Sequence, residues 1–184
     1  MEATFLQEVD GIRRLVPGTR PGPRPGPRPG PDEVVVAVRA VGVNRIDIWV
    51  RNRQVLDIPL IHPVRLPLTP AADVVHEIDE HVTQFQVGDE VVLNPAVTCG
   101  HCRECFAGYH GNCRDRLGLG LQLDGGYGGL VAAPEANVHP KPRGLSFVEA
   151  ASIPTAFMTA YQVVLTSAGV QPGERDSGRG QRGR

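Results

Sequence analysis

Four cysteines lie close together in the segment CGHCRECFAGYHGNC, and they are all the cysteines of the 184-residue chain. Cys99, Cys102 and Cys105 are each three residues apart, and Cys113 follows after seven intervening residues. A tight turn can point three such sulfurs inward while the fourth completes a tetrahedron around Zn²⁺. Two disulfides are the alternative, but reduced thiolates on a metal fit a chain without an N-terminal secretion signal better. The spacing therefore predicts one zinc ion held by four thiolates.

A site of this kind is structural rather than catalytic. A closed shell of four thiolates leaves no open coordination position for water or substrate. His101 and His110 lie in the same segment, but the shell is complete without them. Four thiolates on a divalent ion leave a charge of about −2, and Arg103, Arg114 and Arg116 are near enough in sequence to offset it.

Short apolar, β-branched segments surround the cysteines and must position them. Residues 33–44 read EVVVAVRAVGVN, and further strands are expected over residues 74–78, 88–95 and 127–140. Many short strands separated by Gly, Pro and Asp predict a closed or partly closed barrel. The fold class expected is mainly β with C-terminal helices.

The helical pattern begins at residue 146. Ser146 followed by Glu149 is typical of a capping box at a helix N-terminus, with Leu145 placed to act as a hydrophobic staple. Pro154 is expected to divide the segment into two helices, because its ring removes a backbone donor and clashes with the preceding turn. Gly169 is the predicted stop.

The rest of the chain is divided by composition. Residues 1–16 are expected to form an N-terminal strand region, residues 17–31 a linker that contains RPGPRPGPRPGP, and residues 32–169 the main domain. The linker is read as an extended spacer, with a proline-rich ligand for an aromatic groove as the alternative. Residues 170–184 are Gly/Arg-rich and are expected to be a disordered tail.

Several separated motifs resemble one family. The cysteine segment is preceded by VGVNRIDIWVR and GDEVVLNP and followed by LVAAPEANVHPKPRGLSFVEAASIP. In this order the motifs resemble the zinc-containing alcohol dehydrogenase group of the medium-chain dehydrogenase/reductase superfamily, over residues 33–173. The resemblance implies a GroES-like, partly closed β-barrel with a zinc-binding lobe at residues 99–113. A Rossmann domain that binds NAD or NADP for hydride transfer to or from a carbonyl normally follows it.

The family's ligands for a second, catalytic zinc are not matched. In the segment GVNRID, Asn44 occupies the position where the family has a cysteine, which resembles the zinc-free quinone reductase branch. An amide is a poor substitute for a thiolate on zinc. The Gly-His-Glu motif expected within residues 66–79 is absent, and the third position falls near Thr155. His76 and Glu77 are adjacent, and neighbours in a strand point to opposite faces. No catalytic zinc is expected.

The Rossmann domain is not matched either. Gly178, Gly180 and Gly183 satisfy the pattern GxGxxG, but no predicted strand precedes them and no predicted helix follows. We therefore expect a truncated oxidoreductase in which NAD(P), implied by the resemblance, has no site. The arginines of the tail lack accompanying aromatic residues, so an RNA partner is not predicted.

Asn44 and Asp47 are the candidate catalytic residues. The Asn44 amide could orient a carbonyl and the Asp47 carboxylate could fix the local structure; in the alternative, Asp47 caps a turn and Asn44 ends a strand. Trp49 either lines the substrate pocket or belongs to the core. The rival function is a non-catalytic, zinc-stabilised module that binds a protein partner, which an exposed apolar patch within residues 147–164 would favour.

The net charge and the hydropathy of the chain limit which partners are expected. The net charge of −1 and the pI near 6.6 give no electrostatic case for nucleic acid or an anionic membrane. No apolar run is long enough to span a bilayer, so a cytoplasmic protein is expected. The expected partners are a small carbonyl or alcohol substrate, and a second copy of the chain or another protein.

Overall fold

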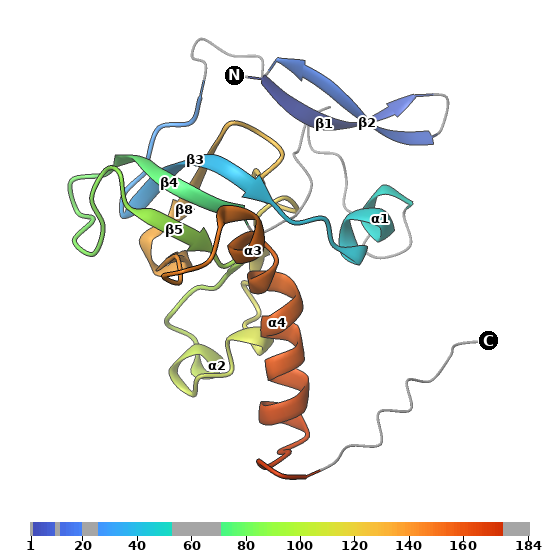
Figure 1. Cartoon of the computed structure of the whole chain (residues 1–184), viewed down its shortest axis with the longest axis vertical. Helices are drawn as coiled ribbons and strands as arrows, with labels where there is room; N and C mark the ends of the chain where they lie inside the picture. Colours follow the sequence, from blue (N-terminus) through green and yellow to red (C-terminus); the bar gives the residue numbers. More distant parts are fainter. Residues whose placement is uncertain (1, 10–11, 20–25, 53–70, 175–184) are drawn as a thin grey trace.

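A curled five-stranded sheet forms the centre of the computed structural model, which describes residues 2–9, 12–19, 26–52 and 71–174. Its order is β8 (Leu130–Pro134), β3 (Glu33–Val41), β4 (Ala71–Ile78), β5 (Glu90–Leu93) and β9 (Val138–Pro140), and all neighbours are antiparallel. The edge strands β8 and β9 are joined by the three-residue 3₁₀ turn η2 (Glu135–Asn137). Three residues span at most about 10 Å, so the two edges must approach each other, and the predicted partly closed barrel is confirmed (Figure 1).

The barrel interior is filled by branched aliphatic side chains. Alternate residues of a strand point to the same face, which places Val34 and Val36 of β3 inside the barrel with Val75 of β4 and Val91 of β5. The outer face of β3 and β4 is covered by the short helix α3 (Phe147–Ala151), whose Ala150 packs near Ala72. Small side chains on both surfaces allow this close approach.

Two irregularities interrupt the pairing of β3 with β4. The register shifts between Val35 and Val36, where His76 of β4 has no opposite residue, and again between Val38 and Ala40. Extra residues of this kind bend a strand and increase its twist, which helps a small sheet to curl. Adjacent residues of a strand were expected to point to opposite faces, but His76 and Glu77 are both exposed. Neither side chain is therefore buried in the barrel.

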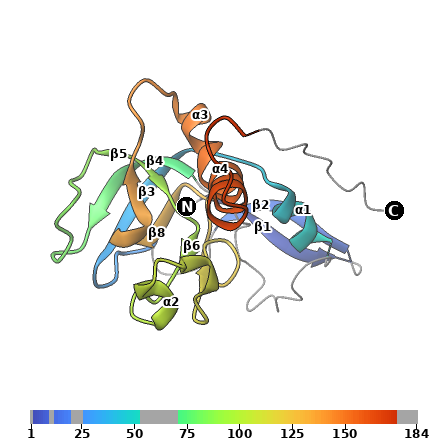
Figure 2. The ribbon, with the colours of Figure 1, turned by 90° about the horizontal axis from the view of Figure 1, so that it is seen from below.

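The predicted division of the helical segment is confirmed. Ser146 Oγ accepts a hydrogen bond from the Glu149 amide at 3.3 Å, and the Glu149 carboxylate accepts one from the Ser146 amide at 2.8 Å. Helix α3 ends at Ala151, and α4 (Ile153–Tyr161) begins with Pro154 in its first turn. The π-helical η3 (Gln162–Ser167) continues α4, and Gly169 follows with a left-handed φ of 66°. Together α4 and η3 extend away from the barrel (Figures 1 and 2).

An N-terminal hairpin lies beside the barrel. Strands β1 (Glu2–Val9) and β2 (Ile12–Thr19) pair antiparallel, and the Thr4 amide donates to the Tyr127 carbonyl at 2.8 Å. Strand β2 therefore includes residues 17–19, which the sequence had assigned to the linker. The proposed linker residues 20–25, residues 66–70 and tail residues 175–184 with their GxGxxG pattern lie outside the described residues. No described helix is long and apolar enough to cross a membrane.

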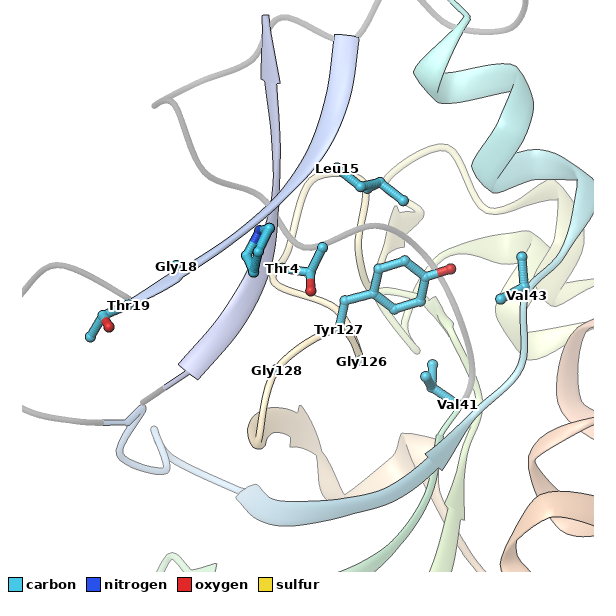
Figure 3. A pocket seen from close by; sticks show the side chains of 10 residues that line it. Thr4, Leu15, Gly18, Thr19, Val41, Val43, Gly126, Tyr127 and Gly128 are labelled. Atoms are coloured by element: carbon cyan, nitrogen blue, oxygen red, sulfur yellow. The ribbon is translucent and has the colours of Figure 1, made fainter.

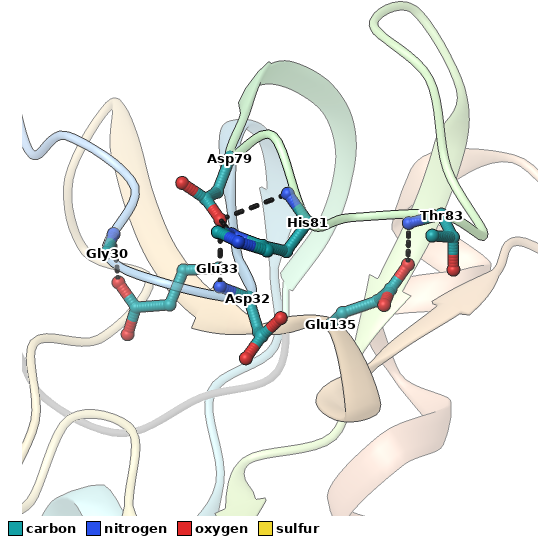
Figure 4. A network of polar contacts seen from close by, with 7 residues as sticks. All are labelled: Gly30, Asp32, Glu33, Asp79, His81, Thr83 and Glu135. Atoms are coloured by element: carbon teal, nitrogen blue, oxygen red, sulfur yellow. Dashed lines mark hydrogen bonds and ion pairs between the residues drawn. The ribbon is translucent and has the colours of Figure 1, made fainter.

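Carboxylates hold together the turns that join the barrel strands (Figure 4). Asp79, after β4, accepts hydrogen bonds from the Asp32 amide at 3.1 Å and contacts the His81 ring at 2.7 Å. The hydrogen bond with His81 lowers the pKa of Asp79 to about 2. Glu135 of η2 accepts from the Thr83 and Gln84 amides at 2.8 and 2.6 Å. These bonds fix the turn that precedes β5 against η2, and so they support the closure of the barrel.

Candidate functional site

The four cysteines occupy one lobe between two short paired strands. Strands β6 (Ala96–Val97) and β7 (Leu117–Gly118) pair antiparallel at its base. Cys99 follows β6, Cys102 is the N-cap of the one-turn helix α2 (Arg103–Phe106), Cys105 lies within α2, and Cys113 directly follows η1 (His110–Asn112). Gly100, with a φ of 75°, makes the turn between the first two cysteines. The lobe thus brings together residues that are separated by up to fourteen positions.

The sulfur positions fit a metal ion. All four Sγ atoms lie within 4.8 Å of one another, and three pairs are separated by 3.5, 3.6 and 3.9 Å. A tetrahedron with Zn–S bonds of about 2.3 Å has sulfur–sulfur edges of about 3.8 Å. The cysteines are free thiols, so the disulfide alternative is wrong in this structure. The lobe could hold a metal ion without rearrangement of its sulfurs.

The thiols differ in their tendency to ionise. Hydrogen bonding from the His101 amide lowers the pKa of Cys99 to about 6. The Cys105 amide favours ionised Cys102, but burial and the neighbouring thiols outweigh it and raise the pKa of Cys102 to about 12. The pKa of Cys113 is raised as well, the Cys99 amide being outweighed by burial and by the other thiols. Four thiolates this close repel one another, and a divalent cation is what lets them ionise together.

The histidines and arginines of the lobe do not contact the sulfurs as ligands. His101 is exposed, and its Nδ1 lies 2.7 Å from the Cys99 carbonyl oxygen. His110 is exposed in η1, and the metal-binding group in the described part of the chain consists of the cysteines alone. Arg116 donates to the Gly111 carbonyl at 3.3 Å, while Arg103 is exposed on α2. The arginines therefore supply surface charge near the centre.

The candidate residues Asn44 and Asp47 lie together at the start of helix α1 (Arg45–Arg51), which the sequence analysis did not predict. Asn44 is the N-cap residue, and its backbone N–H donates a hydrogen bond to Asp47 Oδ2 at 2.6 Å. Asp47 is buried, and its Oδ1 has no hydrogen-bond partner among the described residues. Burial raises the pKa of Asp47 to about 6, while the Asn44 amide acts in the opposite direction. Asp47 thus fixes the first turn of α1 and keeps one oxygen unused.

A cavity of about 910 Å³ lies between the N-terminal hairpin, the end of β3 and the loop at residues 126–128 (Figure 3). Leu15, Val41 and Val43 give it apolar walls, and the Tyr127 ring extends into it with its hydroxyl directed toward Val43. Val43 immediately precedes Asn44. Neither Asn44 nor Asp47 lines the cavity, so the candidate residues adjoin it rather than face it.

Two other residues that the sequence analysis singled out, Trp49 and Thr155, do not line the cavity. Trp49 is 38% exposed, so it does not belong to the core. It does not line this cavity, and its role in a substrate pocket stays a prediction. Thr155 is half-buried in α4. The sequence analysis missed Tyr127 as a cavity residue, because its neighbours there come from distant parts of the chain. It also missed Asp73, although a carboxylate within the apolar run AADVV is a visible signal.

Asp73 is an acidic side chain enclosed by the barrel. It lies in β4 opposite Val38 of β3 and Val91 of β5, and it is 0% exposed. Neither carboxylate oxygen has a hydrogen-bond partner among the described residues. Burial raises the pKa of Asp73 from 3.8 to about 8, with a smaller opposing effect of the Arg39 backbone. The side chain is consequently protonated at neutral pH.

Known proteins resemble the whole arrangement. Residues 30–143, which contain the barrel strands and all four cysteines, match the alcohol dehydrogenase GroES-like domain. The chain belongs to this family. The chain is 36% identical over 146 residues to an alcohol dehydrogenase of Geobacillus stearothermophilus, covering 77% of this chain and 42% of that protein. An L-threonine 3-dehydrogenase of Rhizobium etli is 39% identical over 90 residues, which is 49% of this chain and 26% of the relative.

Solved structures share the same fold. An NAD-dependent alcohol dehydrogenase superposes with a TM-score of 0.81 and 37% identity, covering 95% of this chain and 49% of that one. A cobalt- and zinc-bound thermostable alcohol dehydrogenase from Pyrobaculum aerophilum gives a TM-score of 0.77 and 32% identity, covering 95% and 50% of the two chains. The GroES-like chain thus spans about half the length of the proteins that it resembles.

Proposed function

We propose that this GroES-like chain is the substrate-side domain of an NAD(P)-dependent oxidoreductase that acts on a small alcohol or carbonyl compound. The observation that carries the proposal is the match of residues 30–143 to the alcohol dehydrogenase GroES-like domain. The dehydrogenase names of its relatives support the same reaction class. The cavity beside Val43 has apolar walls and a phenol hydroxyl, which suits a small, mainly apolar molecule with one polar group.

The metal of this domain is proposed to be one structural zinc ion. Cys99, Cys102, Cys105 and Cys113 would supply four thiolates and leave no position for substrate. Bound zinc contributes folding free energy directly, because the unfolded lobe does not present a preformed site. The zinc would thus fix the lobe between β6 and β7 and take no part in hydride transfer.

The described residues do not fit a nicotinamide dinucleotide. Such cofactors bind at the junction of a parallel β-strand and the helix that follows it, whereas the paired strands of the described sheets are all antiparallel. The cofactor would have to meet the domain at a surface that these residues contribute only in part.

Asn44 and Asp47 remain the proposed polar residues of the reaction site. The Asp47 carboxylate accepts a hydrogen bond from the Asn44 backbone N–H and thereby fixes the backbone from which the Asn44 side chain extends. Asn44 does not line the cavity but follows Val43 of its wall, and the Asn44 carboxamide has both a donor and an acceptor with which it would orient a hydroxyl or carbonyl group beside the cavity. Asp47 would act as a positioning residue rather than as the group that touches substrate.

The second candidate function is a non-catalytic, zinc-stabilised module that binds a protein partner. One observation favours it: the α4–η3 helical segment exposes several large apolar side chains, among them Phe157, Tyr161 and Leu165. Exposed apolar groups gathered on one element indicate an interaction surface.

Titration with small alcohols and carbonyl compounds distinguishes the two functions. The zinc-loaded chain is titrated by calorimetry with a panel of small alcohols, aldehydes and ketones, since these compounds would bind the substrate-side domain itself. The oxidoreductase function predicts saturable binding that is weakened at least tenfold in Asn44→Ala but stays near wild type in Asn52→Ala, an exposed substitution at the other end of α1. Absence of binding of every compound up to millimolar concentration would reject it in favour of the binding module.

A further inference from the structure

The four sulfurs of the cysteine lobe differ in their exposure to solvent. Cys105 and Cys113 are buried, with 6% and 7% of their surface exposed, whereas Cys99 and Cys102 are half-buried. The oxidation of cysteine in proteins follows its accessibility as well as its thiolate character. A small oxidant that arrives from solvent would therefore react first at Cys99 or Cys102.

Each half-buried cysteine has a buried cysteine as a close neighbour. The Cys102 and Cys105 sulfurs are 3.5 Å apart, and the Cys99 and Cys113 sulfurs are 3.6 Å apart. We call these the two close pairs. The contact between Cys99 and Cys105 is longer, at 3.9 Å. A disulfide bond is about 2.0 Å long, so the sulfurs of each close pair need to approach by only about 1.5 Å.

The backbone of the lobe suits the same pairing. Cys102 is the N-cap of α2, and Cys105 lies one turn later in that helix, a spacing that places both side chains on one side of the turn. Cys99 follows β6, and Cys113 precedes β7, which pairs with β6 at the base of the lobe. A bond between Cys99 and Cys113 would thus join the chain that enters the lobe to the chain that leaves it. Both bonds would form within the closed lobe.

We propose that the lobe is a site of reversible oxidation, at which a peroxide converts the four zinc ligands into two disulfides, one within each close pair, and zinc is released. This inference rests on the proposed structural zinc. In the first step the Cys102 sulfur attacks a peroxide oxygen: an S–O bond forms, the O–O bond breaks and hydroxide leaves. The Cys105 sulfur then attacks the oxidised Cys102 sulfur: an S–S bond forms, the S–O bond breaks and a second hydroxide leaves. The Cys99 and Cys113 pair reacts in the same way.

The release of zinc follows from the chemistry of the two bonds. Each disulfide gives two electrons to one molecule of peroxide, and its two sulfurs lose their negative charge. The lobe then no longer offers the thiolates that bind a divalent zinc ion. Zinc would leave because its ligands are consumed, without prior unfolding of the lobe. A dithiol reductant regenerates the thiolates by exchange, so the reduced lobe could bind zinc again.

The test treats the zinc-loaded full chain with hydrogen peroxide and stops samples with catalase at intervals. A colorimetric chelator measures released zinc, and the remaining thiols are counted after denaturation. Zinc should appear in proportion to the thiols lost, one ion for four thiols, and the chain should regain both after dithiothreitol and zinc are added. Met158→Leu is the matched control, because Met158 is an exposed residue that peroxide also oxidises. This variant should release zinc as wild type does.

Peptide mapping identifies the bonds. Trypsin cleaves after Arg103, which leaves Cys99 and Cys102 in one peptide and Cys105 and Cys113 in another. The proposed bonds join these two peptides. Fragmentation of the joined peptides between Cys99 and Cys102 in the mass spectrometer then assigns the partner of each.

Several results would overturn the proposal. Thiols that peroxide leaves unreacted, zinc that stays bound while the thiols are oxidised, sulfinic or sulfonic acids in place of disulfides, or either of the other two pairings would each reject it. Zinc release that Met158→Leu abolishes would place the sensitive residue outside the lobe. The zinc content before peroxide is added tests the structural zinc separately. A chain without zinc that forms the same two disulfides would reject the zinc and support the pairing.

Discussion

Asp73 is the residue whose chemistry agrees least with its position. Its carboxyl group lies in the barrel among valines, neither oxygen has a hydrogen-bond partner in the part of the chain that the structure describes, and burial raises its pKa from 3.8 to about 8. The unfolded chain releases the proton near the lower value. When the pKa of a group is higher in the folded state than in the unfolded state, the group stabilises the fold fully at a pH below the unfolded-state pKa. This stabilisation is lost as the pH rises through the folded-state pKa. Asp73 should therefore make the fold less stable as the pH increases from about 4 to 8.

We predict that Asp73→Asn removes this pH dependence. Between pH 6 and pH 8 the free energy of unfolding of wild type should fall by up to roughly 1.4 kcal/mol per pH unit because of this one group, whereas the amide cannot ionise. Urea unfolding at several pH values measures the slope. Glu77→Gln, in the exposed part of the same strand, is the matched control and should keep the wild-type slope. Equal slopes for Asp73→Asn and wild type would show that Asp73 is not protonated in the fold.

The zinc ligands give a second prediction at this scale. Cys102→Ser should lower the zinc content from one ion per chain to nearly none and unfold the lobe, because three thiolates cannot close the tetrahedron and the lobe has no other metal-binding group in the described residues. His101→Ala and His110→Ala are the matched controls and should retain zinc. Elemental analysis and thermal unfolding provide the readouts. Loss of zinc from either histidine variant would mean that the ligand set is wrong.

At the scale of elements, the sequence predicted best where a local rule decides the structure. The Ser146–Glu149 capping box, the division at Pro154 and the stop at Gly169 follow from hydrogen-bonding capacity and backbone restriction, and all three are present. Helix α1 was missed because its residues RIDIWVR continue an apolar run that also suits a strand. The hydrogen bond from the Asn44 backbone N–H to the Asp47 carboxylate favours the helix over the strand. In the sequence, an Asn and an Asp three residues apart are only a weak signal of this bond.

Asn137 joins η2 to the segment that enters the zinc lobe. It is buried, and its Nδ2 donates to the Asn94 and Ala96 carbonyls at 2.9 Å each. Asn137→Ala should lower the free energy of unfolding by about 1–3 kcal/mol, because it removes both donors and leaves those carbonyls without them. Denaturant unfolding measures the loss, and Asn112→Ala on the exposed η1 should be neutral. An Asn137→Ala variant within 0.5 kcal/mol of wild type, the usual range for surface changes, would show that this connection is unimportant.

At the scale of the whole molecule, the family and the barrel could be inferred from the chain, but the cavity could not. The cysteine spacing and the order of the flanking motifs specify a lobe on a GroES-like barrel, and residues 30–143 match that domain. The cavity requires Leu15, Val43 and Tyr127 to meet from three separate segments. No local pattern encodes this meeting, because it depends on how the hairpin is seated against the loop, which the bond from the Thr4 amide to the Tyr127 carbonyl fixes.

We propose that zinc bound by the four cysteines stabilises the lobe between β6 and β7 and takes no part in catalysis. The most direct measurement is the zinc content of the purified chain together with the number of thiols that react with a thiol reagent before and after chelation. We expect one zinc ion per chain, four thiols that do not react with the reagent, and four reactive thiols once the metal is removed. Two zinc ions per chain, or a zinc-loaded chain with reactive thiols, would contradict a single closed four-thiolate site.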